Sequence, residues 1–402
     1  MIPDLNRLVL AMINRAGISI TAESTVICKP FARPSGATNG SGERRAFPRR
    51  PAGLILSGAT FPVVVRRVSP EGGGRATPTA PKANPMTAPA ERRLLTVQPR
   101  GFCAGVERAI EVVDRLLELH GTPLFVRREI VHNRSVVEDF RARGVVFVDE
   151  LDEVPDGATV VFSAHGIAPT VREDAERRGL QAIDATCPLV TKVHQEVLRH
   201  VDDGRHMILI GHAGHDEVLG TMGEAPGHIT LVTSVADVAL LPFPDGTPLA
   251  LATQTTLSVD ETHAIADALR ARYPQLVEPA RSDICYATQN RQDAVKALVD
   301  LGIGYLLVVG STNSSNSRRL CEVAINLGVP ATLIDGPADL DLASLADIAV
   351  IGLTAGASAP EHLVQAVVRE LTAAGWAEEP VLAMQENVRF QLPPELQAPR
   401  RN

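Results

Sequence analysis

The sequence has few cysteines, few aromatic residues and no long apolar run. Its 402 residues include five cysteines, none of them in a CxxC pair, so a disulfide framework is not indicated. No apolar stretch approaches the ~18 residues that a membrane-spanning helix needs. No GxGxxG motif follows a predicted strand, which argues against a bound flavin or nicotinamide. These absences favour a soluble cytoplasmic protein with no membrane partner.

Charge is distributed unevenly, with a basic leader before an acidic body. Residues 1–93 contain 14 Lys/Arg against 5 Asp/Glu, whereas the remainder contains 25 against 42. The leader is rich in Pro, Gly, Ala and Arg without sustained periodicity, which predicts disorder. Its arginine bias leaves a transit peptide open, but a protein start near Met86 is the preferred interpretation. Because aromatic side chains are scarce there, we expect no nucleic-acid partner.

Three of the cysteines open the same kind of segment. Each stands in a loop and precedes an amphipathic helical pattern that ends near a glycine. The segments are GFCAGVERAIEVVDRLLELHG, ATCPLVTKVHQEVLRHVDDG and DICYATQNRQDAVKALVDLG, which contain Cys103, Cys187 and Cys285. The other two cysteines differ, because Cys28 lies in the leader and Cys321 falls on the apolar face of a predicted helix. The chain therefore contains one pattern three times.

Two polar clusters follow each of these cysteines, and each cluster stands at the end of an apolar strand pattern. The first cluster comes 29, 28 and 30 residues after its cysteine, at His132, His215 and Ser315. The second comes 62, 68 and 73 residues after it, at His165, Thr255 and Ser358. Strands and helices that alternate at this spacing predict parallel sheets. Ligands collect at the carboxyl ends of such strands.

The predicted fold is α/β, with three pseudo-equivalent α/β domains and parallel sheets arranged around a common centre. The repeat places the domains at residues 94–187, 188–281 and 282–374, followed by a C-terminal tail over 375–402. Three such units around an axis would bring three cysteines and six polar clusters to one point.

Three thiolates at one point can hold zinc or an iron–sulfur cluster, and either would lack a fourth protein ligand. Zinc sites usually take ligands from short local spacings, whereas these cysteines are 84 and 98 residues apart. The long spacing favours a larger inorganic core, and we prefer a [4Fe-4S] cluster with one iron not bound by protein. Three unrelated buried cysteines are the alternative, and their shared repeat position argues against it.

The polar clusters offer hydrogen-bonding groups with hardly a Lys or Arg among them. Their members are His132, Asn133, His165, His215, Glu217, Thr253 to Thr256, Ser314 to Asn316 and Ser358. Imidazoles, hydroxyls and amides at helix N-termini can bind a diphosphate. Glu217 is the only acid among them and is a candidate proton donor. A single histidine of this kind is more often a packing or capping residue, but the repetition favours ligand binding for His132, His165 and His215. For Glu217 the alternative is a helix-capping glutamate at the surface.

Nine short motifs resemble those of one known family over about residues 95–375. They are GFCAGVERAI, VHNRSVV, SAHGI, DATCPLVTKVH, GHAGHDEVLGTMGE, TQTTLSVDET, DICYATQNRQDAV, GSTNSSNSRRL and TAGASAPE. Together they resemble the 4-hydroxy-3-methylbut-2-enyl diphosphate reductase family, which acts last in the methylerythritol phosphate route to isoprenoids. Asp216 is a departure, since the family often has proline at that position.

The resemblance implies a three-lobed fold around a [4Fe-4S] cluster held by Cys103, Cys187 and Cys285. It implies that Glu217 and Thr255 supply protons in a reductive dehydroxylation that gives isopentenyl and dimethylallyl diphosphate, with electrons from ferredoxin or flavodoxin. The residues that it implies for substrate binding are His132, His165, His215, Thr255, Ser314, Ser315, Asn316 and Ser358.

Two other classes of protein remain open on the sequence. A cluster-bearing dehydratase would also leave one iron open, but it would need no external electrons. An iron–sulfur sensor or carrier would have no use for a ring of diphosphate-binding groups. Turnover with and without a reductant separates the first alternative, and a failure to bind any diphosphate would favour the second.

Overall fold

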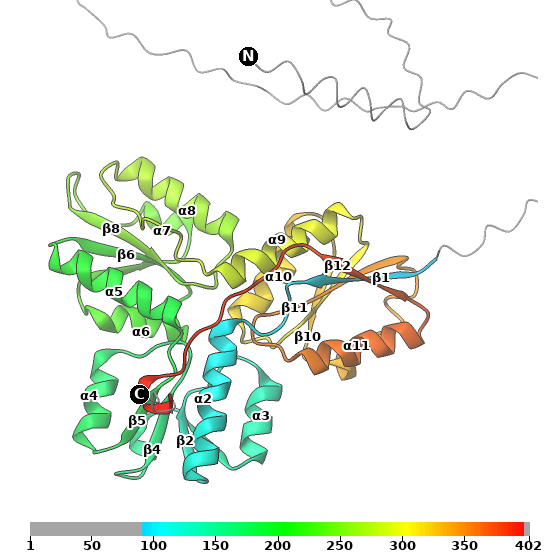
Figure 1. Ribbon diagram of the computed structural model, residues 1–402. Helices are drawn as coiled ribbons and strands as arrows, with labels where there is room; N and C mark the ends of the chain where they lie inside the picture. Colours follow the sequence, from blue (N-terminus) through cyan, green and yellow to red (C-terminus); the bar gives the residue numbers. More distant parts are fainter. Residues whose placement is uncertain (1–90, 398–402) are drawn as a thin grey trace, which may run out of the picture. The chain divides into compact units, whose positions relative to one another are not determined.

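The computed structural model describes residues 91–397, which form three α/β lobes (Figure 1). The predicted disordered leader, with Cys28, lies outside the described residues except for its last three positions. Within the described range no helix combines the length and the apolar character that crossing a bilayer would require. Each lobe is built on one sheet.

The three sheets share one strand order. In each sheet the first strand after the cysteine-bearing helix lies between the second and third strands, as β3-β2-β4, β7-β6-β8 and β10-β9-β11. All nine strand pairings within residues 91–397 are parallel. The predicted repeat of parallel sheets is therefore confirmed. The two strands of each sheet that end in polar clusters are neighbours, so both clusters of a lobe lie together.

The first and second sheets carry the following elements. The first has β2 (Leu124–Arg127), β3 (Val145–Val148), β4 (Thr159–Phe162) and β5 (Gln181–Asp184), with α2 (Ala104–His120), α3 (Arg134–Ala142), η1 (Leu151–Glu153) and α4 (Pro169–Arg177). The second has β6 (His206–Ile210), β7 (Ile229–Val232) and β8 (Leu249–Thr253), with α5 (Pro188–Asp202), α6 (Asp216–Glu224), α7 (Val235–Val238) and α8 (Val259–Arg272).

The third sheet is the largest, with the order β10-β9-β11-β1-β12. Its elements are β9 (Tyr305–Val309), β10 (Ala331–Ile334), β11 (Val350–Ala355), β1 (Arg93–Gln98) and β12 (Ala377–Leu382), with α9 (Tyr286–Asp300), α10 (Ser315–Asn326), η2 (Pro337–Asp339) and α11 (Glu361–Ala373). A last short turn of helix, η3 (Pro394–Leu396), follows β12.

Sheet membership differs from the predicted ranges at both ends of the chain. β1 falls in the range predicted for the first domain, but it pairs with β11 and β12 in the third sheet. β12 adds a strand where the sequence predicts only a tail. The repeat explains why β1 belongs to the third sheet. β5, the strand before Cys187, pairs with β4 in the first sheet. β1, the strand before Cys103, occupies the equivalent position beside β11 in the third sheet. The domain boundaries themselves stay a prediction.

Helices cover both faces of each sheet, and this explains the apolar strands. In the third sheet Leu306 and Val308 pack in one core with α9 and α10, whereas Leu307 and Val309 pack in another with α11. α2 and α3 cover one face of the first sheet and α4 the other, while α8 lies opposite α5 and α6 in the second. A strand buried on both faces is an almost continuous apolar run. Cys321 belongs to the α9 and α10 core, as predicted.

Candidate active site

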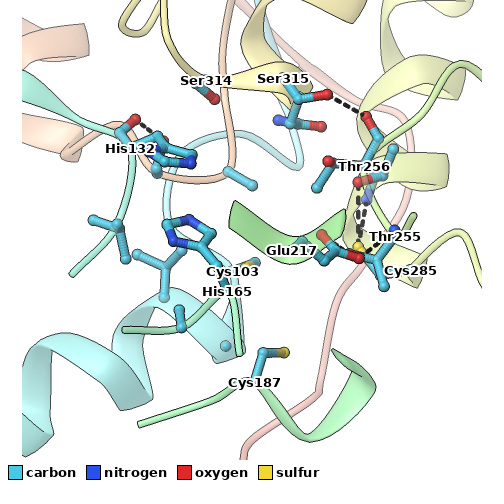
Figure 2. A pocket seen from close by; sticks show the side chains of 18 of the residues that line it. Cys103, His132, His165, Cys187, Glu217, Thr255, Thr256, Cys285, Ser314 and Ser315 are labelled. Carbon is cyan, nitrogen blue, oxygen red and sulfur yellow. Dashed lines mark hydrogen bonds between the residues drawn. The ribbon is translucent and has the colours of Figure 1, made fainter. Parts of the chain in front are cut away.

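A cavity with about 680 Å³ of space not filled by protein atoms lies where the polar clusters of the three sheets meet (Figure 2). Every residue predicted for binding or catalysis lines it, and the lining includes Cys103, Cys187, Cys285, His132, His165, His215, Glu217, Thr255, Ser314, Ser315, Asn316 and Ser358. Three other cluster members, Asn133, Thr253 and Gln254, do not line it. Asn133 caps α3, accepting a hydrogen bond from the Val136 N–H, and Thr253 is buried at the end of β8.

The three cysteines occupy equivalent places in the fold, because each is the N-cap residue of a helix. Cys103 precedes α2, Cys187 precedes α5 and Cys285 precedes α9. The positive end of a helix dipole stabilises a thiolate. The Cys285 Sγ also accepts a hydrogen bond from the Thr288 N–H at 3.4 Å. The predicted helices end close to glycines, as the sequence indicated; the N–H of Gly121, for example, closes α2 on the Leu117 carbonyl.

Cys187 and Cys285 nevertheless lie where an isolated thiolate is unfavourable. Burial, followed by the charge of Cys103, raises the pKa of Cys187 to about 12, and the same two causes raise the pKa of Cys285 to about 11. A metal ion or cluster would offset both causes. Gly105 leaves room beside the sulfurs, since a Cβ on it would stand 2.7 Å from the Cys187 Sγ and 3.9 Å from the Cys103 Sγ. These features fit a metal group held by three thiolates.

Three imidazoles form another part of the wall. The rings of His132 and His165 are stacked, with centroids 3.9 Å apart, and the His215 ring lies edge-on at 5.2 Å from His132. Burial, together with the neighbouring histidines, lowers the pKa of His165 well below its usual value and that of His215 to about 3. Both rings are therefore neutral at pH 7, and each keeps one N–H that can be donated to an anion.

Glu217 is almost fully buried in the first turn of α6. Its Oε1 accepts the Thr255 N–H at 2.6 Å and its Oε2 accepts the Thr255 hydroxyl at 3.1 Å. Burial raises the pKa of Glu217 to about 7, although the two hydrogen bonds from Thr255 oppose the rise. The carboxyl can therefore both hold and release a proton near neutral pH.

The third lobe supplies hydroxyl and amide groups at the N-terminus of α10. Ser314 caps the helix, and the Ser315 hydroxyl donates to the Thr256 carbonyl at 3.1 Å. Asn316 is only 3 % exposed, yet neither its Nδ2 nor its Oδ1 has a hydrogen-bond partner among the described residues. A buried amide without partners is costly. It indicates a ligand that contacts Asn316 in the cavity.

Two residues that the sequence analysis did not single out contact the histidines. The Glu129 carboxylate lies 3.2 Å from His132 Nδ1 and also accepts from Asn313 Nδ2 at 2.6 Å. The Ser163 hydroxyl lies 3.2 Å from His165 Nδ1. Such partners fix the orientation and the tautomer of an imidazole. Glu129 lies between the end of β2 and His132, so its position offered a signal; Ser163 directly follows the buried strand β4 and offered a weaker one.

The chain is similar in sequence to a well-defined group of proteins. The model of the LytB protein family matches residues 94–372. A relative from Bordetella pertussis, named 4-hydroxy-3-methylbut-2-enyl diphosphate reductase, is 59% identical over 307 residues, which are 76% of this chain and 94% of the relative. A relative of the same name from Alcanivorax borkumensis is 57% identical over 300 residues, covering 73% of this chain and 96% of its own length.

Solved structures agree with the sequence comparison. The E-1-hydroxy-2-methyl-but-2-enyl-4-diphosphate reductase from Plasmodium falciparum superimposes with a TM-score of 0.75 and 39% identity, covering 76% of this chain and 97% of that one. A second reductase structure, described as the terminal enzyme of the non-mevalonate pathway, has a TM-score of 0.52 and 27% identity and covers 70% of this chain and 99% of that one. On the family model and these relatives, the chain belongs to the LytB protein family.

Proposed function

We propose that this protein is a 4-hydroxy-3-methylbut-2-enyl diphosphate reductase, which removes the hydroxyl of its substrate and gives isopentenyl and dimethylallyl diphosphate. The observation that carries the proposal is the composition of one cavity. Three N-cap cysteines line it together with three imidazoles, a buried carboxyl and an amide without partners. A dehydratase or an iron–sulfur carrier would not require both sets of groups.

In this proposal Cys103, Cys187 and Cys285 hold a [4Fe-4S] cluster, with one iron not bound by protein. The cluster would supply electrons and an open coordination position for an oxygen of the substrate. Burial disfavours free thiolates at Cys187 and Cys285, and Gly105 leaves space beside two of the sulfurs. Both observations support a metal group with thiolate ligands at this place.

The histidines, hydroxyls and amide of the same wall would bind the diphosphate. His165 and His215 can each donate one N–H, and the Asn316 amide has no hydrogen-bond partner within residues 91–397. Ser314 stands at the N-terminus of α10, where backbone N–H groups and the helix dipole favour an anion. The other groups that we assign to substrate binding are His132, Thr255, Ser315 and Ser358. They lie close enough to share one ligand, since all line the same cavity.

Glu217 would hold one of the two protons that the reaction consumes with two electrons when the hydroxyl leaves as water, and Thr255 is its partner. A pKa near 7 lets the buried carboxyl carry a proton at neutral pH, and the Thr255 hydroxyl is its direct hydrogen-bond partner. Glu217 and Thr255 both line the cavity, so either side chain can contact a ligand there. Both residues act as proton carriers in this proposal.

Two further parts of the proposal concern the electron donor and the cellular compartment. The electrons come from ferredoxin or flavodoxin, because a reductive step needs an external donor and the sequence contains no dinucleotide-binding motif. The reaction takes place in the cytoplasm, where the four cysteines of residues 91–397 would remain free thiols or metal ligands.

One experiment tests the function and its alternatives. The protein is purified without oxygen, its iron and sulfide are measured, and turnover of the allylic diphosphate is followed with and without a chemical reductant. We expect about four irons and four sulfides per chain and turnover only with the reductant. Turnover without reductant would indicate a dehydratase, and the absence of diphosphate binding would indicate a carrier.

A further inference from the structure

The chain continues past β12 as a strap, which we define as residues 383–397. It leaves the third sheet beside β1, where the Ala383 N–H donates to the Gln98 carbonyl at 2.9 Å. It then runs past α9 and α2 to the first lobe (Figure 1). There Leu392 and Leu396 pack against the core formed by α2, α3 and their sheet. The segment predicted as a tail therefore connects two lobes.

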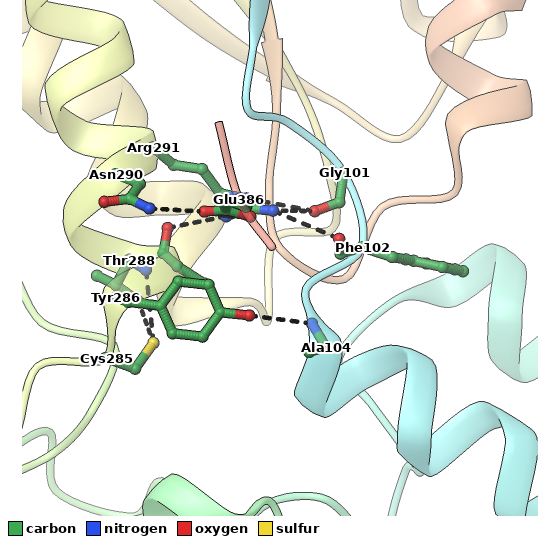
Figure 3. A network of polar contacts seen from close by, with 10 residues as sticks. Gly101, Phe102, Ala104, Cys285, Tyr286, Thr288, Asn290, Arg291 and Glu386 are labelled. Atoms are coloured by element: carbon green, nitrogen blue, oxygen red, sulfur yellow. Dashed lines mark hydrogen bonds and ion pairs between the residues drawn. The ribbon is translucent and has the colours of Figure 1, made fainter. Parts of the chain in front are cut away.

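A buried ion pair holds the first part of the strap (Figure 3). Arg291, on α9, is 0 % exposed and contacts the Glu386 carboxylate at 3.0 Å. The same guanidinium donates to the Gly101 carbonyl at 2.7 Å, two residues before Cys103. Because Cys285 caps the helix that carries Arg291, this one side chain links the strap with two of the cysteine loops.

A second arginine makes the equivalent link to the remaining cysteine loop, that of Cys187. Arg108, on α2, donates from Nε to the Gln391 carbonyl of the strap at 2.8 Å. Its Nη1 donates to the Thr186 carbonyl at 3.0 Å. Thr186 immediately precedes Cys187. The strap thus contacts arginines that hold the backbone beside all three cysteines.

The Glu386 carboxylate has hydrogen-bond partners from two residues of α9. Asn290 donates to the Glu386 Oε1 at 3.0 Å, in addition to Arg291. A direct link between the first and third cysteine loops lies next to them, because the Ala104 N–H donates to the Tyr286 hydroxyl at 3.3 Å. A buried pair with this many partners fixes geometry, and removal of one charge leaves the other without compensation.

We propose that the strap is a positioning element for the metal site, which fixes the three cysteine loops relative to one another through Arg291 and Arg108, and that the Arg291–Glu386 pair balances charge beside the metal. This rests on the proposed role of the cysteines as cluster ligands. Since the Arg291 side chain is fully buried and that of Glu386 is only 16% exposed, loss of either charge acts on the cluster with less screening than at the surface. Loss of Glu386 leaves a positive charge, which favours the reduced cluster, and loss of Arg291 leaves a negative charge, which disfavours it.

The test compares Glu386→Gln, Arg291→Gln and the wild-type holoenzyme. The midpoint potential of the cluster, measured by anaerobic titration, should rise in Glu386→Gln and fall in Arg291→Gln. A second readout needs no activity or metal signal. Arg389 is exposed in the middle of the strap, and tryptic cleavage after it should be severalfold faster in Glu386→Gln because the strap is released more often.

Glu379→Gln is the matched control, because Glu379, on β12, forms an exposed ion pair with Arg93 on neighbouring β1. It should change neither the potential nor the cleavage. Unchanged potential and cleavage in Glu386→Gln would overturn the proposal, as would shifts of the same sign in both variants, which would indicate general loosening. If Arg291→Gln does not fold, Glu386→Gln decides alone. Wild-type protein without iron would contradict the proposed function instead, and the cleavage comparison would still decide whether Glu386 holds the strap.

Discussion

The Glu217 carboxylate receives two hydrogen bonds from one residue, Thr255, through its backbone N–H and its side-chain hydroxyl. The two residues come from different elements of the second lobe, the start of α6 and the loop after β8. This arrangement fixes both oxygens of the carboxyl at the wall of the cavity, which Glu217 and Thr255 both line. A carboxyl whose pKa is raised to about 7 by burial, and which is held in this way, is suited to deliver one proton per cycle.

Replacement of Glu217 by glutamine should reduce turnover by ~10² or more, because the amide keeps the shape but cannot ionise. Substrate should still bind, since the diphosphate-binding groups are unchanged. Steady-state kinetics and a substrate-induced change in the cluster spectrum measure the two effects. Asp260→Asn is the control, because Asp260 is an exposed acid of the same lobe in the first turn of α8. Near-normal turnover of Glu217→Gln would remove Glu217 from the mechanism.

Serine at Cys103, Cys187 or Cys285 should abolish the iron–sulfur absorption or leave an unstable remnant. A hydroxyl is a poorer ligand than a thiolate, and each lobe supplies only one of these ligands. Cys321→Ser should keep the absorption, because Cys321 packs in the core of the third lobe away from the cavity. Iron content and visible spectra measure the outcome. Equal loss in all four variants would contradict the assignment.

Gly105→Ala should also reduce iron content, although it removes no ligand. A Cβ at this position would stand 2.7 Å from the Cys187 Sγ, closer than atoms can approach without displacement. The sulfur would have to move from its place. Gly304→Ala is the matched control, since its Cβ would be 3.5 Å from Ile348, an ordinary contact. Iron analysis of both variants after anaerobic reconstitution distinguishes a lost metal site from the general effect of a new methyl group, and full iron content in Gly105→Ala would argue against this placement of the metal.

The residues at the centre of the molecule could be predicted from the sequence because the same pattern occurs three times. A cysteine before a helix and a polar residue after a strand are local features, and the parallel sheet brings the strand ends together. The repeat thus predicted that His132, His215 and Ser315 would lie near one another, and they line one cavity.

The sequence was insufficient where the structure depends on contacts between distant segments. β1 reads as the start of the first domain, but its partners are 257 and 284 residues away along the chain, from Arg93 to Val350 and Ala377. Glu386 lies in a segment without periodicity, and only the fold shows that its partner is the buried Arg291. Neither pairing has a local sequence signal.

Asn316→Ala should weaken diphosphate binding by about tenfold without a comparable loss of stability. The Asn316 amide has no partner within the described protein, so its removal breaks no internal hydrogen bond, whereas one hydrogen bond to a charged ligand contributes ~1.5 kcal/mol or more. Pyrophosphate titration and thermal unfolding measure the two quantities. Asn326→Ala, at the exposed end of the same helix, is the control. Lower stability with unchanged pyrophosphate binding would show that the Asn316 amide stabilises the fold and does not bind the diphosphate.

Stability should decrease as the pH falls below about 6.5, and His215 should be a principal cause. Burial lowers its pKa to about 3 in the folded protein, while an unfolded histidine has a pKa near ~6.5. Between these values the unfolded chain binds a proton that the folded chain does not bind. The free energy of unfolding therefore falls as pH decreases through this range, by at most ~1.4 kcal/mol per pH unit for one group.

The proton would also disturb a hydrogen bond. His215 Nδ1 accepts from the Glu217 N–H at 3.1 Å and caps α6, and a protonated imidazole can no longer accept. In His215→Asn, asparagine can still cap the helix but does not titrate, so urea unfolding between pH 7 and pH 5 should show a smaller decrease in stability than wild type. His263→Asn, on the exposed surface of α8, should retain the wild-type slope. If His215→Asn also retains the wild-type slope, the pH dependence of stability arises from other groups. The neighbouring His165 would then be the next residue to replace.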